Sequence, residues 1–194
     1  MTGIAAEPAA VLTIGHSSRS LGEFLALLEA HNAGSVVDVR RFPGSRRNPQ
    51  FSAGPLADAL AVRGTRYLHM PGLGGRRRPR AESPNLGWRN ASFRAFADYM
   101  LTPEFGREFQ ELLGQAAHTR IAVMCAEALP WRCHRMLICD MFAVRGVPVI
   151  HILGPGSVRP HVLTPFAREC GDVLLYPQPP ADQPHRVVMD GRNP

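Results

Sequence analysis

The sequence contains no lysine, and all 22 of its permanently basic residues are arginine. Arginine keeps its proton at physiological pH, so it cannot form the Schiff base that a lysine amine forms with a carbonyl group. This absence excludes lysine Schiff-base enzymes and nucleotide-binding loops that depend on a P-loop lysine. A coding bias toward arginine is the simplest cause of the composition, and the exclusions hold whatever the cause.

Long apolar runs and a dense cysteine pattern are missing as well. No apolar stretch approaches the roughly 20 residues that a membrane span needs. Residues 1–10 lack the basic start and the apolar core of a secretory signal. Four cysteines in a chain of 194 residues do not make a disulfide framework. We therefore expect a protein of the reducing cytoplasm that makes no contact with a membrane.

The chain is long enough for one domain with a sizeable core, and its 45% hydrophobic and 20% charged residues are ordinary for a globular protein. We expect a disordered N-terminus over residues 1–10 and a single α/β domain over residues 11–170. Residues 171–194 are rich in proline and have little periodicity, so we expect them to form an extended or disordered tail.

Short apolar runs alternate with amphipathic segments along this domain. The runs that predict strands are 11–14, 35–39, 65–70, 121–124 and 147–153. The segments that predict helices are 20–31, 55–63, 91–101, 103–117, 130–145 and, with a weaker pattern, 162–169. Strands separated by helical crossovers pair in parallel, and helices then cover both faces of the sheet. The expected fold class is therefore α/β, a single-domain three-layer sandwich with a mainly parallel sheet of about five strands.

Two of these helices have well-marked starts. Ser20 and Glu23 have the spacing of a capping box. Thr102 followed by Pro103 is typical of an N-cap and a first helical position. We therefore expect helices to begin at these points.

Polar residues follow several of the predicted strands. They are His16 after the first strand, Asp38 and Arg40 after the second, His69 after the third, and Cys125 and Glu127 after the fourth. Ligands of parallel sheets bind beyond the carboxyl ends of the strands. We therefore expect these side chains to share one edge of the sheet and to line a common pocket.

Cys133 is the stronger candidate for a catalytic thiol. It lies near the expected N-terminus of a helix, where the helix dipole and the neighbouring Arg132, His134 and Arg135 favour a thiolate. Cys125, at the end of the preceding strand, is the second candidate. The alternative is that both cysteines are buried structural residues, because free cysteine is among the most buried residue types.

Three further residues are candidates for acid–base chemistry. Asp38 and Glu127 could act as general bases or orient a ligand, or they could simply pair with neighbouring arginines. His16 has the side chain best suited to carry a proton near neutral pH. A plain loop hydrogen bond is an equally good interpretation of His16.

Arginine is concentrated in one part of the sequence. Between Arg40 and Arg94 there are twelve arginines and only two acidic residues, Asp58 and Glu82. Guanidinium groups bind phosphate and carboxylate through paired hydrogen bonds, and interleaved aromatic residues are typical of sites for single-stranded nucleic acid. The alternative is a solvated basic surface. The residues assigned to anion or substrate binding are Arg40, Arg46, Arg47, Arg76, Arg89, Asn90, Arg132, His134 and Arg135.

Cysteine and histidine in this region also raise the question of a metal site. Zinc-binding groups are carried by Cys125, Cys133, His134, His16 and Asp38, but the spacing of the two cysteines and His134 is not that of a zinc finger or ribbon. Cys133 and His134 would also point about 100° apart if both lay on one helix. We therefore predict neither a metal ion nor another cofactor.

The pattern Cys125-x-Glu127-x-x-Pro130-x-x-Cys133-His134-Arg135 resembles the signature of the bacterial and archaeal family called domain of unknown function 488. Stretches that also resemble this family are 13–19, 37–51, 73–76 and 88–90. The resemblance extends from about residue 11 to residue 153. It implies an α/β fold and supports this choice of residues, and it implies no established reaction.

The leading hypothesis is an enzyme that acts on a phosphorylated substrate, either a nucleotide or a nucleic-acid strand. The arginines would hold the anion, and Cys133 or His16 would carry the chemistry. The alternative is a non-catalytic nucleic-acid-binding module in which the same arginines contact the backbone and the cysteines are structural. The sequence leaves open the substrate, the reaction and the oligomeric state.

Overall fold

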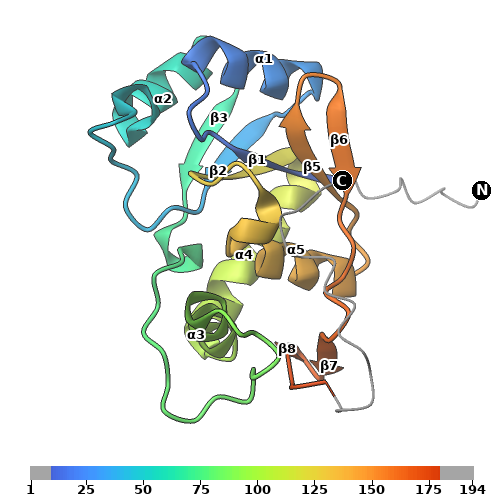
Figure 1. The fold of residues 1–194 in the computed structure, drawn as a ribbon. Helices are drawn as coiled ribbons and strands as arrows, with labels where there is room; N and C mark the ends of the chain where they lie inside the picture. Colours follow the sequence, from blue (N-terminus) through green and yellow to red (C-terminus); the bar gives the residue numbers. More distant parts are fainter. Residues whose placement is uncertain (1–9, 180–194) are drawn as a thin grey trace, which may run out of the picture.

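The computed structural model describes residues 10–179, which are built around a six-stranded sheet (Figure 1). The strands are β1 (Val11–Gly15), β2 (Ser35–Asp38), β3 (Arg66–His69), β4 (Ile121–Cys125), β5 (Val149–Gly154) and β6 (Ser157–Pro160). Their order across the sheet is β3-β2-β4-β1-β5-β6. The first five pair in parallel, and β6 adds an antiparallel edge to β5. The predicted α/β class with a mainly parallel sheet is confirmed.

Helices cover both faces of this sheet. They are α1 (Leu21–Ala30), α2 (Ala53–Ala61), α3 (Ala91–Met100), α4 (Pro103–His118) and α5 (Arg135–Val144), with 3-10 turns η1 (Pro49–Phe51), η2 (Pro71–Leu73) and η3 (Pro130–Arg132). Helices α1 and α2 pack on one face, and α3, α4 and α5 pack on the other (Figure 1). The three-layer arrangement is therefore confirmed as well. None of the described helices combines the length and the apolar character needed to cross a membrane.

A hydrophobic core lies on each face of the sheet, and the central strand β4 contributes side chains to both. Successive side chains of a strand point to opposite faces, so Ile121 and Val123 pack with α3, α4 and α5, whereas Ala122 and Met124 pack with α1 and α2. Every residue of β4 is buried. A strand that is buried on both faces has a continuous apolar sequence, as this one does.

Two helix starts follow the capping residues that mark them in the sequence. Ser20 and Glu23 form the expected capping box at the start of α1. The Thr102 hydroxyl accepts an amide hydrogen bond at the start of α4. These contacts satisfy amides that no carbonyl of the helix reaches, and both predicted starts are confirmed.

The helix predicted to begin at Pro130 is interrupted. Pro130 starts the short turn η3, and Cys133 then has an extended backbone (φ −131°, ψ 144°) before α5 begins at Arg135. The prediction that Cys133 lies on the helix is therefore wrong. At this interruption the Arg135 guanidinium group donates a hydrogen bond to the Glu127 carbonyl, which ties the preceding loop to the start of α5.

The segment that follows β6 also differs from its prediction. Residues 162–167 form no helix, and residues after them form a hairpin of β7 (Arg168–Cys170) and β8 (Val173–Leu175). The His161 imidazole and the Thr164 amide both bind the buried carboxylate of Asp140. These two hydrogen bonds tie residues 161 and 164 to α5, and a turn follows at residues 165–166. The predicted helix over 162–169 is therefore wrong.

The first part of the predicted tail is packed against the domain. Tyr176 is fully buried, its hydroxyl donates a hydrogen bond to Asp140 at 2.9 Å, and its amide donates one to Asn85 Oδ1 at 2.8 Å. The expected domain boundary at residue 170 thus falls inside the β7–β8 hairpin. The rest of the predicted tail, from residue 180, and nearly all of the predicted disordered N-terminus (1–9) lie outside the described residues.

Candidate active site

The carboxyl ends of β1 and β4 form the centre of the site. These neighbouring strands are followed by α1 and α5, which lie on opposite faces of the sheet, so their ends form a topological switch point. Ligands of α/β sheets bind at such points. His16 follows β1 and Cys125 ends β4, and the His16 amide donates a hydrogen bond to the Cys125 carbonyl at 3.1 Å. The structure therefore brings these two predicted residues together.

Gly15 allows the loop after β4 to pack on the end of β1. A Cβ atom at this position would lie 1.9 Å from the Glu127 carbonyl oxygen, which is far too close for a real contact. The same carbonyl accepts a hydrogen bond from Arg135 Nη2. A side chain at residue 15 would therefore displace the loop that separates Cys125 from Cys133.

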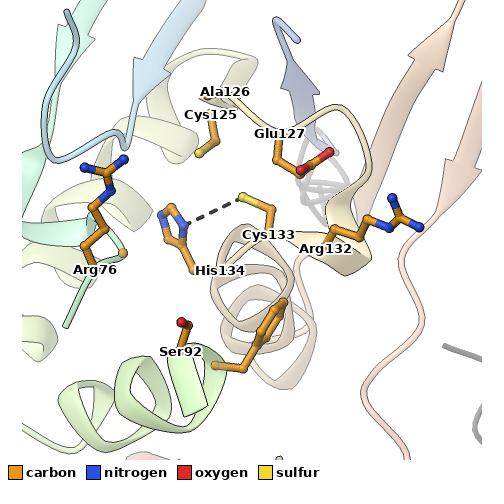
Figure 2. Close-up of a pocket in the computed structure, with 10 residues that line it drawn as sticks. Arg76, Ser92, Cys125, Ala126, Glu127, Arg132, Cys133 and His134 are labelled. Atoms are coloured by element: carbon orange, nitrogen blue, oxygen red, sulfur yellow. Dashed lines mark hydrogen bonds between the residues drawn. The ribbon is translucent and has the colours of Figure 1, made fainter. Parts of the chain in front are cut away.

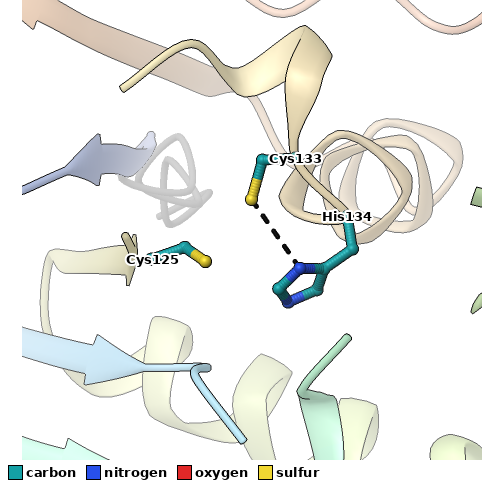
Figure 3. Close-up of side chains that lie close together, drawn as sticks. All are labelled: Cys125, Cys133 and His134. Carbon is teal, nitrogen blue, oxygen red and sulfur yellow. Dashed lines mark hydrogen bonds between the residues drawn. The ribbon is translucent and has the colours of Figure 1, made fainter. Parts of the chain in front are cut away.

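Cys125 and Cys133 face each other across this loop (Figure 3). Their sulfur atoms and a ring nitrogen of His134 all lie within 4.8 Å of one another. His134 Nδ1 is 3.7 Å from Cys133 Sγ, and Arg135 Nε donates a hydrogen bond to the same sulfur at 3.4 Å. Both cysteines are free and buried. Cys133 is thus surrounded by a thiol, an imidazole and a guanidinium group.

Arg135 is a fully buried guanidinium group. Its Nη2 binds the Glu127 carbonyl, and its Nη1 has no partner in residues 10–179. Among the described residues, no carboxylate lies within ion-pair distance of it. A buried charge without a counter-charge is strongly destabilising. The group positioned to balance Arg135 is Cys133, in its thiolate form.

The two thiols therefore hold their protons very differently. Burial alone would raise the pKa of Cys133, but the neighbouring Cys125 thiol and the charge of Arg135 lower this pKa well below the usual range of a thiol. The pKa of Cys125 is raised well above that range, because the neighbouring Cys133 sulfur and burial both disfavour a second thiolate. These directions favour the thiolate form at Cys133 and the protonated thiol at Cys125.

A pocket of about 390 Å³ opens over the two cysteines (Figure 2). Arg76 and Arg132 lie on either side of Cys133 and His134 in this view, and both arginine side chains are exposed. The sulfur atoms are therefore at the floor of a hollow whose rim carries positive charge. The lining residues are Gly75, Arg76, Ser92, Phe93, Cys125, Ala126, Glu127, Arg132, Cys133 and His134.

The family model described as domain of unknown function DUF488 matches residues 20–142. The chain belongs to this family. The matched region contains both cysteines, His134 and Arg135, and it begins after His16. No curated protein and no solved structure matches the chain.

In this DUF488 chain, Asp38 and Arg40 form a closed cluster at the end of β2. Asp38 accepts hydrogen bonds from Arg40 Nε at 2.8 Å and from the Tyr67 hydroxyl at 2.7 Å. Arg40 also donates to the Phe51 carbonyl at 2.7 Å, and its Nη1 lies 3.3 Å from His16 Nε2. Asp38 is fully buried, and Arg40 is 6% exposed. The predicted base and the predicted anion-binding arginine are thus each other's counter-ions.

His16 belongs to the same cluster. Its Nδ1 bonds to the Ser17 carbonyl at 3.0 Å, and its ring stacks on Phe51 with 4.4 Å between ring centroids. Burial lowers the pKa of His16, so the neutral ring donates from Nδ1 and accepts from Arg40 at Nε2. With both nitrogens engaged, His16 has no free position from which to exchange a proton with a ligand.

The other residues assigned to anion binding fall into two groups. Arg76, Arg132 and His134 line the pocket, and Arg135 lies beneath it. The residues Arg46, Arg47, Arg89 and Asn90 do not line it and are exposed. Asn90 instead caps α3, where its side chain accepts hydrogen bonds from the amides of Ser92 and Phe93.

Sequence reasoning did not identify Gly75, Ser92 and Phe93 as lining residues. A Cβ atom on Gly75 would lie 2.9 Å from His134 Nδ1, so only glycine lets the chain pass this close. The next residue, Arg76, has a φ of +59°, which few non-glycine residues adopt. The paired glycines were a visible signal of a close approach. Nothing in the sequence indicated that the start of α3 reaches the cysteines.

Cys125, Cys133 and His134 offer three donor atoms close enough for one metal ion. The expectation that Cys133 and His134 diverge is wrong, because Cys133 precedes the helix instead of lying on it. A divalent cation bound here would lie next to the buried positive charge of Arg135, and this group offers three donor atoms, one fewer than a structural zinc site uses. A thiol–thiolate pair therefore suits this site better than a metal ion does.

A second group of donor atoms belongs to Cys139, His151 and His161. His161 Nε2 bonds to Asp140 at 2.9 Å, and His151 Nδ1 bonds to the Thr13 hydroxyl at 2.8 Å. The two nitrogens that remain, one on each ring, lie 3.1 Å apart and bond to each other. All four ring nitrogens are therefore already satisfied by a continuous hydrogen-bonded chain.

Proposed function

We propose that this protein is an enzyme in which the Cys133 thiolate attacks an anionic, phosphorylated substrate. The observation that carries the proposal is the contact between Cys133 Sγ and the buried Arg135, at 3.4 Å. It keeps a thiolate at the floor of a pocket open to solvent. Thiolates, and not thiols, are the nucleophilic form of cysteine. The site thus has an activated nucleophile and room for a substrate above it.

The rim of the pocket supports an anionic substrate. Arg76 and Arg132 are exposed there, and neither is paired with a carboxylate in the part of the chain that the structure describes. Guanidinium groups bind phosphate through paired, charge-assisted hydrogen bonds. A phosphate held between these two arginines would place the rest of the substrate over Cys133.

His134 and Glu127 are the groups placed to move protons. His134 Nδ1 faces the sulfur, and its Nε2 has no partner among the described residues. Attack by the thiolate forms a bond from Cys133 Sγ to the electrophilic atom while the bond to the leaving group breaks, and His134 protonates the departing group. Glu127 is exposed at the rim, where it can take a proton from the water that then hydrolyses the cysteinyl intermediate.

The thiolate is tested by alkylation. We expect iodoacetamide to label Cys133 faster than Cys170 between pH 6 and 7, because Cys170 is an ordinary exposed thiol. Peptide mapping by mass spectrometry would give the rate at each residue, and the deeply buried Cys139 is the internal control for unfolding. Equal or slower labelling of Cys133 would rule out its role as the nucleophile.

The substrate class is tested by a thermal-shift screen of phosphorylated metabolites, nucleotides and short oligonucleotides. A ligand of the native state raises the melting temperature by mass action. Arg76→Ala should weaken the shift given by any genuine ligand. Arg63→Ala is the matched control, because Arg63 is exposed and pairs with Glu29. A screen in which no phosphorylated compound stabilises the protein would contradict the substrate class.

A second candidate function is non-catalytic binding of nucleic acid. It is favoured by exposed arginines outside the pocket that have no carboxylate partner among the described residues, namely Arg46, Arg47, Arg78, Arg80 and Arg89. Binding through the phosphate backbone weakens steeply as salt is added. An affinity for oligonucleotides that falls in this way, and that survives Cys133→Ser, would favour this function over catalysis.

A further inference from the structure

We propose that Cys125 and Cys133 form a reversible disulfide bond when a hydroperoxide oxidises the site. This modification deepens the proposed function, because it depends on Cys133 being the reactive thiolate. It gives Cys125, which the proposed reaction does not use, a chemical role of its own.

The geometry of the two sulfur atoms supports the bond. They lie within 4.8 Å of each other at the floor of the pocket (Figure 3). A disulfide needs an S–S distance of about 2.05 Å, so the sulfurs must approach by less than about 3 Å. The loop of residues 126–132 that joins the two cysteines contains only the single turn η3. A small movement of this loop is enough to close the gap.

The environment of each cysteine assigns its part in the reaction. The Cys133 sulfur accepts a hydrogen bond from Arg135 Nε, which favours the thiolate that attacks peroxides. The pKa of Cys125 beside it is raised, which favours the protonated thiol there. Redox-reactive cysteines are typically ionised, accessible and adjacent to a second thiol that resolves the oxidised form. The two cysteines have this arrangement, with the pocket as the route for a small oxidant.

The disulfide bond forms in two steps. The Cys133 thiolate attacks the terminal oxygen of the hydroperoxide, the O–O bond breaks, and a sulfenic acid forms while the alkoxide or hydroxide leaves and takes a proton from solvent. Cys125 then attacks the Cys133 sulfur, the S–O bond breaks, and the departing hydroxide takes the Cys125 proton to leave as water. The two cysteines together give two electrons to the peroxide. A dithiol reductant reverses the change by thiol–disulfide exchange.

The other cysteines do not compete for this role. Cys139 is buried within α5, and burial raises its pKa. Cys170 is exposed on β7, so it can link two molecules but lies outside the pocket. We therefore expect one specific intramolecular bond and not a mixture of products.

The test treats the reduced, full-length protein with hydrogen peroxide in slight excess and measures its intact mass. The expected result is a loss of two hydrogen atoms, a Cys125–Cys133 link in the peptide map, and full reversal by dithiothreitol. Cys125→Ser should instead accumulate oxygen on Cys133, first as a sulfenic acid that dimedone traps. Cys139→Ser and Cys170→Ser are the matched controls and should form the bond as the unaltered protein does.

The outcomes separate this inference from the proposed function. If iodoacetamide labels Cys133 rapidly but peroxide gives only oxygen adducts in the unaltered protein, the disulfide inference is wrong and the nucleophile stands. If Cys133 reacts with neither reagent, both are wrong. A bond that joins other cysteines would also overturn the inference. The measurement on the unaltered protein decides the question even if a variant fails to fold.

Discussion

Two buried arginines lie at the same edge of the sheet, and their partners differ in kind. Arg40 is paired with the Asp38 carboxylate, which also accepts a hydrogen bond from Tyr67. Arg135 is balanced by the sulfur of Cys133, and its Nη1 has no partner within the described part of the chain. A carboxylate is a permanent counter-ion, whereas a thiolate is a counter-ion that can also react. The difference separates a closed structural cluster from a candidate active site.

The largest expected effect comes from breaking the closed cluster. Asp38→Asn leaves the buried Arg40 without a counter-charge, and we expect it to reduce the free energy of unfolding by about 3–5 kcal/mol. Urea unfolding followed by circular dichroism would measure this loss. Asp58→Asn is the control, because Asp58 is exposed on α2 and has no ion-pair partner among the described residues. A small effect at Asp38 would mean that the cluster does not depend on its charges.

A smaller effect is expected at Gly15, which lies between the two clusters. Gly15→Ala would push the Glu127 carbonyl away from Arg135, and overpacking of this kind costs about 1–3 kcal/mol. It should also slow the alkylation of Cys133. Gly22→Ala is the control, since nothing lies within 4 Å of a Cβ atom there. An alanine at position 15 that leaves both stability and labelling unchanged would show that the loop is not held by this contact.

Arg135→Met tests whether the charge of Arg135 keeps Cys133 ionised. Without the cation the pKa of Cys133 should return toward the ordinary thiol value of about 8.5, at which only a few per cent of a thiol is ionised at pH 7. We therefore expect its alkylation rate at pH 7 to fall by roughly tenfold or more. The stability cost should be below that of Asp38→Asn, because a protonated thiol leaves no charge buried. Arg145→Met, at the other end of α5, should leave labelling unchanged. A rate equal to that of the unaltered protein would refute the charge pairing.

The smallest effect is a difference in pH dependence. The pKa of Cys133 in the folded protein is lower than the ordinary thiol value of about 8.5. The thiolate therefore stabilises the folded state fully above about pH 8.5, and this contribution is lost as the pH falls through the folded pKa. The free energy of unfolding should change by no more than about 1.4 kcal/mol per pH unit. In the closed cluster, the lowered pKa of His16 costs stability only below its ordinary value of 6.5. Unfolding of the unaltered protein and of Cys133→Ser should therefore converge first between pH 8.5 and 6.5. Parallel pH profiles of the two proteins would contradict a folded-state thiolate.

Local signals predicted most of the fold and only part of the site. The apolar run of β4 and the capping box at Ser20 act over a few residues, and the structure follows both. The sequence could not distinguish Arg40 from Arg135, because each arginine follows a strand end and only tertiary packing decides which anion it meets. The break between η3 and α5 was also invisible in the sequence, where Pro130 marks only one helix start. Long-range contacts also brought Ser92 and Phe93 to the pocket.

Helix α5 begins with a buried arginine whose charge is balanced by the Cys133 thiolate. The reactivity of this cysteine and the stability of the helix therefore depend on the same charge. Any electrophile that caps the Cys133 sulfur would also remove the anion beside Arg135, so modification of this sulfur should loosen α5. Chemically damaged copies would then unfold more often than intact ones, and cellular proteases remove proteins from the unfolded state. Modification of the Cys133 sulfur would thus lead to selective removal of the modified molecules.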